Sequence, residues 1–207
     1  MASRLLIATG NPGKLRELRE LLSGIPFEIL SPAEAGVESD VCEDGSTYEE
    51  NAILKAATLA QRSQLLTLAD DSGLEVDVLG GEPGIKSARF GGKGITDAQR
   101  NVILLDRLKG VPFEHRTARF QCTMAIAEPG GNVKTCNGSC DGIIALKPAG
   151  VLNFGYDPIF SVDGLTFAER TTAEKTTMSH RGHALAALRQ FLVSKEASEG
   201  APREPKY

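Results

Sequence analysis

The spacing of apolar residues in the first third of the chain predicts strands that alternate with helices. A short apolar run at residues 4–9 ends in the turn-forming segment TGNPG, and the segment KLRELRELL that follows carries leucines at helical spacing. FEIL at residues 27–30 predicts a second strand. The segment STYEENAILKAATLAQRS predicts a long helix, because Ser46 or Thr47 can cap it and acidic residues occupy its first turn.

The middle of the chain changes from strand and helix units to a hairpin. LLTLAD predicts a buried strand that ends in a DSG turn, and the glycine-rich GGEPGIKSARFGG predicts a loop or short turns. Helical spacing returns in DAQRNVILLDRLKG, and TARFQCTMAIAE and KTCNGSCDGIIA then predict two strands around the turn EPGGN. This order of elements predicts an α/β fold with a mixed sheet.

The last part of the chain predicts a loop that enters a final helix, in the segment TAEKTTMSHRGHALAALRQFLVSK. No internal repeat interrupts the pattern. We therefore expect a single domain over residues 1–195 and a disordered tail over residues 196–207.

The segment FGYDPIF, residues 154–160, concentrates three aromatic rings in a chain without tryptophan. Gly155 and Pro158 favour a turn here, since glycine admits unusual dihedrals and proline fixes its own φ. We expect rings on such a turn to be displayed rather than packed in a core. The alternative is an aromatic loop that packs on the domain.

Composition narrows the class of protein. A formal net charge of -4 over 207 residues argues against a broad nucleic-acid or membrane surface, although a local basic pocket for a small anion stays open. The cysteines include one C-x3-C pair but no second pair or histidine at zinc spacing. The N-terminus reaches glycine too early for a signal peptide, and no apolar run approaches the length of a membrane span. We expect a reducing, cytoplasmic setting.

Residues 9–14, TGNPGK, lie between a predicted strand and a predicted helix, where backbone N–H groups and the helix dipole attract phosphate. They are not a Walker A loop, because Ala8 stands in place of its first glycine and Leu15 in place of its magnesium-binding hydroxyl. The alternative is an ordinary turn with a solvated lysine. The candidate phosphate-binding residues are Thr9, Gly10, Asn11, Pro12, Gly13 and Lys14.

Carboxylates form a second candidate group. Asp70 and Asp71 lie at the end of an apolar strand, the position at which α/β sheets present functional groups, and paired acids there need a compensating cation or proton. Lys55, one turn after Asn51, is expected to face the same side as the start of the long helix; the alternative is a lysine whose stem flanks the core. Carboxylate oxygens suit Mg²⁺, and substrate phosphates would complete the coordination shell of the ion. The alternative is that these acids are solvated residues that cap helices. Further candidate ligands are Glu43, Glu49 and Glu50.

The segment SHRGHA supplies a third group. Ser179 can cap a helix whose first turn holds His180 and Arg181, and cations at a helix N-terminus call for a nearby acceptor or anion. Lys175 precedes them in a threonine-rich loop and would be a flexible donor. His183 is expected to be a surface or packing residue.

Five segments in this order and spacing resemble the inosine triphosphate pyrophosphatase family over residues 4 to about 193. They are IATGNPGK, EDGSTYEENAILKA, ADDSGLEVDVLGGEPGIKSARFGG, FGYDPIF and EKTTMSHRGHAL. The resemblance implies an elongated mixed sheet with flanking helices, two lobes around a central nucleotide-binding cleft, and a homodimer. It also implies Mg²⁺-dependent hydrolysis of the noncanonical purine nucleotides ITP, dITP and XTP to the monophosphate and pyrophosphate, which would keep them out of DNA and RNA.

The resemblance also implies residue roles. Residues 9–14 and Lys55 would hold phosphates, Glu43 and Asp71 would hold Mg²⁺, Asp71 would also accept the proton, and Ser72 would contact substrate. The base and sugar end would be formed by Phe154, Gly155, Tyr156, Asp157, Lys175, His180 and Arg181. Two departures from the family pattern, Lys86 and Thr176, concern loop contacts rather than the acidic residues.

Two rival functions remain at this point, a kinase-like phosphotransferase and a non-catalytic nucleotide sensor. The absence of a Walker pattern argues against the first, and the acid cluster argues against the second. Within the hydrolase hypothesis, donors from His180, Arg181 or Lys175 would select the C6 oxygen of hypoxanthine or xanthine over the amino group of adenine. We expect Asp71→Asn to abolish most turnover and Asp70→Asn to be milder.

Overall fold

A seven-stranded mixed sheet forms the centre of the computed structural model, which describes residues 3–151 and 154–199. Its strand order is β2-β1-β3-β4-β5-β6-β7, with β2, β1 and β3 parallel and the remaining neighbours antiparallel. This confirms the predicted α/β fold with a mixed sheet. The strands are β1 (Ser3–Ile7), β2 (Phe27–Leu30), β3 (Leu66–Val76), β4 (Thr117–Ala127), β5 (Val133–Ile144), β6 (Phe160–Val162) and β7 (Leu165–Thr166).

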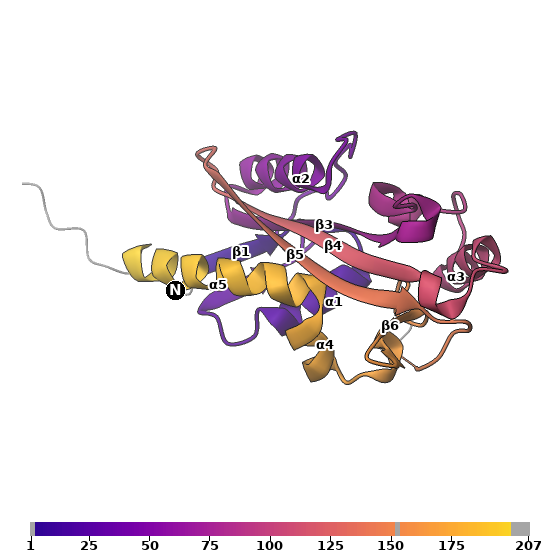
Figure 1. Ribbon diagram of the computed structural model, residues 1–207. Coiled ribbons are helices and arrows are strands. Elements are labelled where there is room, and N and C mark those ends of the chain that lie inside the picture. Colours follow the sequence, from indigo (N-terminus) through magenta and orange to yellow (C-terminus); the bar gives the residue numbers. More distant parts are fainter. Residues whose placement is uncertain (1–2, 152–153, 200–207) are drawn as a thin grey trace, which may run out of the picture.

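Helices cover both faces of this sheet (Figure 1), with α2 on one face and α1 and α5 on the other. Short 3₁₀ helices connect several elements, among them Gly84–Arg89 beside β3. The α-helices are α1 (Pro12–Leu21), α2 (Tyr48–Ser63), α3 (Asp97–Arg107), α4 (Thr172–Met178) and α5 (His180–Glu199). Among the described helices, none has the length and apolar character needed to span a membrane.

The alternation of side chains along β1 explains the two-sided core. Leu5 and Ile7 pack with α1 and α5, whereas Leu6 and Ala8 pack with the alanine-rich face of α2. A third cluster lies toward the other end of the long strands, around Leu104 of α3, Phe120 of β4 and Phe160 of β6. The long β4–β5 hairpin passes through both regions (Figure 1), which gives an elongated sheet whose two ends have separate cores.

Several elements that local sequence signals predicted are confirmed by the structure. Thr47 caps α2, and its side chain and that of Glu50 form the reciprocal bonds of a capping box. The β4–β5 hairpin closes around residues 128–132, as predicted, with Glu128 N–H bonded to Asn132 O at 2.9 Å. FEIL forms β2 without change.

Three predictions need correction. The DSG segment is not a turn, because β3 continues to Val76 and pairs with β4 from Thr67 onward. The threonine-rich loop is instead the short helix α4, capped by Thr171 and Glu174. Residues 196–199, assigned to the tail, lie within α5, and residues 200–207 lie outside the described residues.

The FGYDPIF segment combines a turn with a core element. Residues 155–159 form the predicted turn, with Gly155 at φ 55°, which favours glycine. The expectation that its rings are displayed is wrong for Tyr156 and Phe160, which are buried in the core that contains α3. Phe154 is half-buried.

Candidate active site

The candidate site lies where β3 runs past the end of its parallel neighbour. β1 pairs with β3 only as far as Ile7 opposite Leu68, and the chain then turns through residues 8–11 into α1. Asp70, Asp71 and Ser72 follow Leu68 on β3, so their side chains lie beside this turn. The carboxyl end of a parallel strand is a common location for ligand sites in open α/β sheets.

The two adjacent aspartates point to opposite faces of the sheet, because successive strand residues alternate. Asp70 contacts residues of α1 and α5, and Asp71 contacts residues of α2. As a pair, they were expected to need a compensating cation or proton. In the structure each carboxylate has its own, which removes most of the repulsion expected between neighbouring acids.

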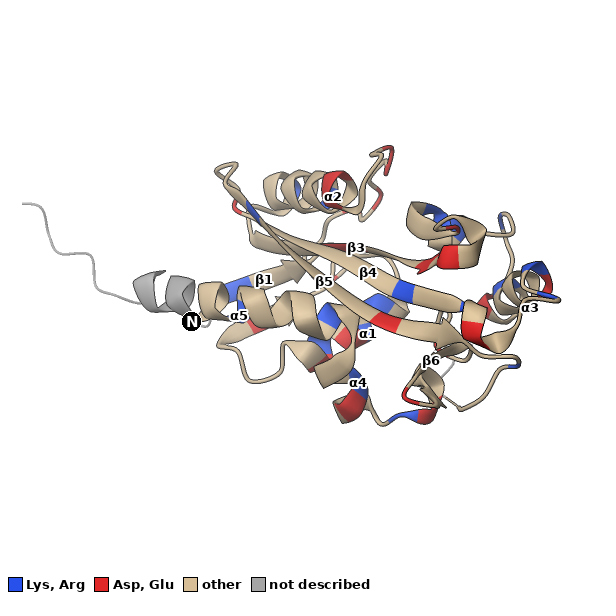
Figure 2. Cartoon of the chain, in the orientation of Figure 1, with Lys and Arg blue, Asp and Glu red and all other residues tan. Residues whose placement is uncertain are grey.

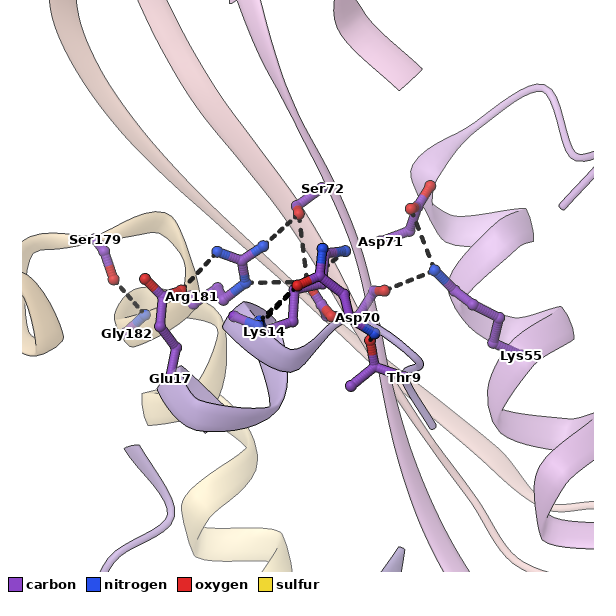
Figure 3. Close-up of polar contacts among 12 residues, drawn as sticks. Thr9, Lys14, Glu17, Lys55, Asp70, Asp71, Ser72, Ser179, Arg181 and Gly182 are labelled. Atoms are coloured by element: carbon purple, nitrogen blue, oxygen red, sulfur yellow. Dashed lines mark hydrogen bonds and ion pairs between the residues drawn. The ribbon is translucent and has the colours of Figure 1, made fainter. Parts of the chain in front are cut away.

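Asp70 is the buried hub of the first face (Figure 3). Its Oδ2 lies 3.1 Å from Lys14 Nζ and 3.0 Å from Arg181 Nε, and its side chain is fully buried. Ser72 lies beside it and accepts a 2.7 Å hydrogen bond from Arg181 Nη2. Burial alone would raise the pKa of Asp70, but the positive charges of Lys14, Arg181 and Lys55 outweigh it and hold that pKa far below its usual value.

Asp71 occupies the second face with Lys55 and Asn51 of α2. Lys55 Nζ lies 3.3 Å from Asp71 Oδ1 and 3.4 Å from Glu43 Oε2, and it also donates to the backbone oxygen of Asp70 at 2.8 Å. Asn51 Nδ2 donates to Asp71 Oδ2 at 3.2 Å. Burial would lower the pKa of Lys55, but Asp71, Asp70 and Glu43 raise it above its ordinary value, so the ammonium stays charged. The predicted facing of Asn51 and Lys55 is confirmed.

The carboxylates of Glu43 and Asp71 fit a divalent cation. Both lie within ion-pair distance of one ammonium, so their oxygens converge on a position where positive charge is favourable. In the part of the chain that the structure describes, no group of three or more His, Cys, Asp or Glu residues is placed to hold a metal. Mg²⁺ is suited to such a site, since it is often bound by one or two carboxylates and substrate phosphates.

The turn before α1 is pre-formed by Asn11. Its Oδ1 accepts hydrogen bonds from the N–H groups of Gly13 at 2.8 Å and Lys14 at 3.2 Å, which caps the helix. These two N–H groups are therefore already occupied, contrary to the expectation that they are free. The polar groups that this turn presents toward a ligand include the Lys14 ammonium and the side chain of Thr9.

Two adjoining cavities meet at this turn. One, of about 480 Å³, is lined by Lys14, Lys55, Glu43 and Asp71, and we call it the lysine cavity. The other, of about 450 Å³, is lined by Phe120, Phe154, Tyr156 and His180, and we call it the aromatic cavity. Their walls share residues of the turn, of β3 and of the 3₁₀ helix beside it, so the two spaces adjoin. The shared residues are Asn11, Lys14, Ser72 and Ala88.

The aromatic cavity contains one prominent unsatisfied polar side chain. His180 is 2% exposed, and neither ring nitrogen has a hydrogen-bond partner among the described residues. Its ring stacks on Phe120, with centroids 4.6 Å apart and planes at 11°. Burial, and then the charges of Arg181 and Lys175, hold the pKa of His180 well below its usual value, so the imidazole is neutral at pH 7. A neutral ring offers one donor and one acceptor.

Phe154 and Tyr156 were both predicted to form the base end of the site, but they occupy different positions in it. The Tyr156 hydroxyl donates to the backbone oxygen of Ser87 at 2.9 Å, so this ring forms a fixed wall. Phe154 packs on the first turn of α1, where a Cβ added to Gly13 would lie 2.3 Å from the Phe154 ring. Gly155 between them is held to Asp97 and Asn101 of α3.

Lys175 and Arg181 are held by carboxylates. Lys175, buried in α4 rather than flexible as predicted, pairs with Asp157 and with Glu17 of α1. Arg181 Nη1 donates to Glu17 at 2.8 Å, and each of its three nitrogens already has a partner. The expected acceptors for these cations are therefore Glu17, Asp70 and Asp157. Ser179 caps α5 as predicted, through Gly182 N–H at 3.1 Å.

Sequence reasoning missed three residues of the site. Glu17 joins the two base-side cations, Phe120 stacks on His180, and Arg89 lines the lysine cavity. Conversely, the candidate ligands Glu49 and Glu50 are engaged elsewhere: Glu50 caps α2, and Glu49 accepts from Thr135 at 2.7 Å. For Glu17, the leucine spacing of its segment predicted helix α1 but gave no sign of its ion pairs. The partners of Glu17 become evident only in the fold.

The fold and the site define an α/β protein with a carboxylate and lysine cavity that adjoins an aromatic one, an arrangement suited to an elongated anion with a flat end. The sequence matches the profile of the Ham1 family over residues 5–191, and the chain belongs to this family. It is 47% identical over 192 residues to the dITP/XTP pyrophosphatase of Geobacter sulfurreducens, covering 92% of this chain and 96% of that one.

Further relatives agree. The dITP/XTP pyrophosphatase of Escherichia coli O157:H7 is 48% identical over 189 residues, which cover 89% of this chain and 95% of that protein. The solved structure of a HAM1 protein from Coxiella burnetii superposes with a TM-score of 0.82 at 39% identity, covering 93% of this chain and 99% of that one. The structure of the Staphylococcus aureus Ham1 protein gives a TM-score of 0.81 at 36% identity, with 93% and 100% covered.

Proposed function

We propose that this chain hydrolyses the noncanonical purine nucleoside triphosphates ITP, dITP and XTP to the monophosphate and pyrophosphate, and so removes them from the nucleotide pool. The single observation that carries the proposal is that the lysine and aromatic cavities adjoin, with Lys14 and Ser72 lining both. A triphosphate fits the first cavity and a purine fits the second. The similarity to dITP/XTP pyrophosphatases supports the same substrates.

In this proposal Asp71 is the proton acceptor. The residue is 7% exposed on the wall of the lysine cavity, and its carboxylate is oriented by Asn51 and Lys55. A positioned carboxylate can take the proton of a water that attacks the α-phosphorus. Lys55 and Lys14 would offset the charge that develops on the phosphate oxygens.

Glu43 and Asp71 would hold Mg²⁺ in this site. When bound, the ion would neutralise phosphate charge and favour pyrophosphate as a leaving group. Lys55 now balances the two carboxylates, so we expect it to turn toward a phosphate when substrate and Mg²⁺ enter. That exchange keeps Lys55, Glu43 and Asp71 each beside an opposite charge.

The aromatic cavity would select the base. Phe154 offers a ring for stacking, which accepts any purine at roughly 1–3 kcal/mol. His180, with its two free ring nitrogens, is the polar group best placed to read the base edge, while Lys175 and Arg181 would shape the pocket through Glu17 and Asp157.

A substrate panel tests the proposal. The protein with Mg²⁺ should turn over ITP, dITP and XTP far faster than ATP, and chelation should abolish activity. Glu43→Gln should raise the Mg²⁺ concentration needed for half-maximal rate, whereas Asp44→Asn, an exposed neighbour, should leave it unchanged. Binding of ITP without turnover would instead support the nucleotide-sensor function.

We also propose that the protein is a cytoplasmic homodimer, on the basis of the family resemblance and the acidic composition. Light scattering should then report twice the 22.0 kDa of one chain. A mass of one chain at micromolar concentration would contradict the dimer.

A further inference from the structure

Figure 2 shows acidic and basic positions interspersed along the ribbon. The charge balance of the lysine cavity therefore depends on which of its cations are paired. Three cations line this cavity: Lys14, Lys55 and Arg89. Lys14 is paired with Asp70, and Lys55 is paired with Glu43 and Asp71. Arg89 differs from both, because its guanidinium has no ion pair or hydrogen bond with any residue that the structure describes.

Arg89 ends the 3₁₀ helix Gly84–Arg89, whose Ile85 and Ala88 line the lysine cavity as well. The helix is fixed against β3: Ser87 Oγ accepts from Leu74 N–H at 2.8 Å and donates to Gly84 O at 2.6 Å. The guanidinium is thus carried by an anchored element, while its side chain stays exposed. An anchored backbone with an unpaired cation at a cavity wall is an arrangement that can receive an anion.

The position of Arg89 along the cavities indicates which part of the ligand it would meet. Lys14, Ser72 and Ala88 line both cavities, whereas Arg89, Lys55 and Glu43 line the lysine cavity but not the aromatic one. If the purine occupies the aromatic cavity, Arg89 lies at the end distant from the base. The α-phosphate would then lie near the shared residues, and the outer phosphates near Arg89.

Charge balance gives a reason for such a contact. The acidic side chains that line the lysine cavity, Asp40, Glu43 and Asp71, equal the cations in number. A triphosphate adds several negative charges, and Lys14 and Lys55 can serve it only by leaving their present carboxylates. Arg89 is available without breaking any described interaction, and a guanidinium can bind a phosphate with two parallel hydrogen bonds.

We propose that Arg89 binds the terminal phosphates of the nucleoside triphosphate, the part that leaves as pyrophosphate. This inference rests on the proposed function for its substrate and adds a residue to the site. Arg89 would contribute to triphosphate affinity without contributing to the choice of base.

Steady-state kinetics with ITP test the proposal on four proteins: the wild type, Arg89→Ala, Arg89→Lys and Lys86→Ala. Lys86 is the matched control, because it is an exposed cation on the same 3₁₀ helix that does not line the lysine cavity. Inhibition by inorganic pyrophosphate and by IMP is measured in parallel. Calorimetric binding of pyrophosphate provides a readout that does not require turnover.

We expect Arg89→Ala to raise KM for ITP about tenfold, the scale of one charge-assisted contact, and to weaken pyrophosphate binding similarly. Inhibition by IMP should not change, the ITP to ATP preference should not change, and Arg89→Lys should recover part of the loss. Lys86→Ala should behave as the wild type.

Unchanged KM and unchanged pyrophosphate binding in Arg89→Ala would overturn the proposal. An equal loss of affinity in Lys86→Ala would also overturn it, because the effect would then come from the electrostatic field of any nearby cation. A wild type that fails to hydrolyse ITP would reject the proposed function. In that case the comparison of pyrophosphate binding between the wild type and Arg89→Ala still decides the role of Arg89.

Discussion

Asp70 Oδ2 lies 3.0 Å from Arg181 Nε, and this contact joins the middle of β3 to the first turn of α5. The same oxygen lies 3.1 Å from Lys14, so one buried carboxylate holds a cation that lines both cavities and a second, Arg181, that lines the aromatic cavity. That Asp70→Asn lowers turnover less than Asp71→Asn stays a prediction, and the structure adds that Asp70 holds these two cations in place. Its Oδ1 has no hydrogen-bond partner among the described residues, which is a costly state that its two cations offset.

Asp70→Asn should destabilise the protein. The buried Arg181 and the partly buried Lys14 would lose their shared counter-charge, and breaking pairs to a buried carboxylate in this way costs roughly 3 kcal/mol. Urea unfolding measures the loss. As a control, Glu82→Gln breaks the exposed pair with Arg107 and should leave the unfolding midpoint nearly unchanged. Equal stability of Asp70→Asn and the wild type would mean that the ion pairs contribute nothing to the fold.

Asp71→Asn should reduce kcat for ITP by at least about 10²-fold, the scale of general-base removal, while the fold persists. Glu75→Gln is the matched control, because Glu75 lies on the same strand and the same face and contacts Tyr48 at 3.2 Å. Its kcat should stay near that of the wild type. If Asp71→Asn retained normal turnover, another carboxylate would have to accept the proton.

His180→Phe should lower the preference for ITP over ATP about tenfold, since it removes both ring nitrogens but keeps the stacking on Phe120. The ratio of kcat/KM values measures this. Phe154→Ala should weaken both purines alike. Arg181→Ala should also lower the ratio, but its contacts to Asp70 and Glu17 predict losses for ATP and in stability as well. A preserved ratio in His180→Phe would assign base selection to other groups.

Sequence patterns predicted those parts of the molecule whose signals are local. The cap of α2 at Thr47, the β2 strand and the β4–β5 hairpin follow from residues a few positions apart. The length of β3 could not be predicted in this way, because the DSG segment has turn composition and becomes a strand only by pairing with β4.

The site shows the same division. Lys14, Lys55 and Asp71 were identified by motif, and the structure brings them to one cavity. Glu17 was missed because its partners lie 158 and 164 residues away in sequence. Tyr156 was assigned to display rather than to the core because burial depends on α3, which no local pattern connects to that turn.

Two buried groups give opposite pH dependence of stability. His180 stays neutral in the fold, whereas the unfolded chain takes up a proton below about pH 6.5, so this group destabilises the fold as pH falls. Burial raises the pKa of Asp157 to about 6, so the fold binds this proton first and gains stability as pH falls from about 6 to 3.8.

Urea midpoints between about pH 4 and 7 measure the balance. Asp157→Asn should make the loss of stability on acidification steeper, because the stabilising proton uptake by Asp157 is removed while the His180 contribution remains. His180→Asn should make it shallower. The opposite pair of changes would show that these groups do not titrate as their surroundings imply.

The central claim is that water, deprotonated by Asp71, attacks the α-phosphorus of ITP and releases pyrophosphate. A turnover of ITP and Mg²⁺ in heavy-oxygen water, with every product quantified by mass spectrometry, tests it most directly. We expect one pyrophosphate for each IMP, with the heavy oxygen in IMP. Accumulation of IDP with labelled orthophosphate would contradict it.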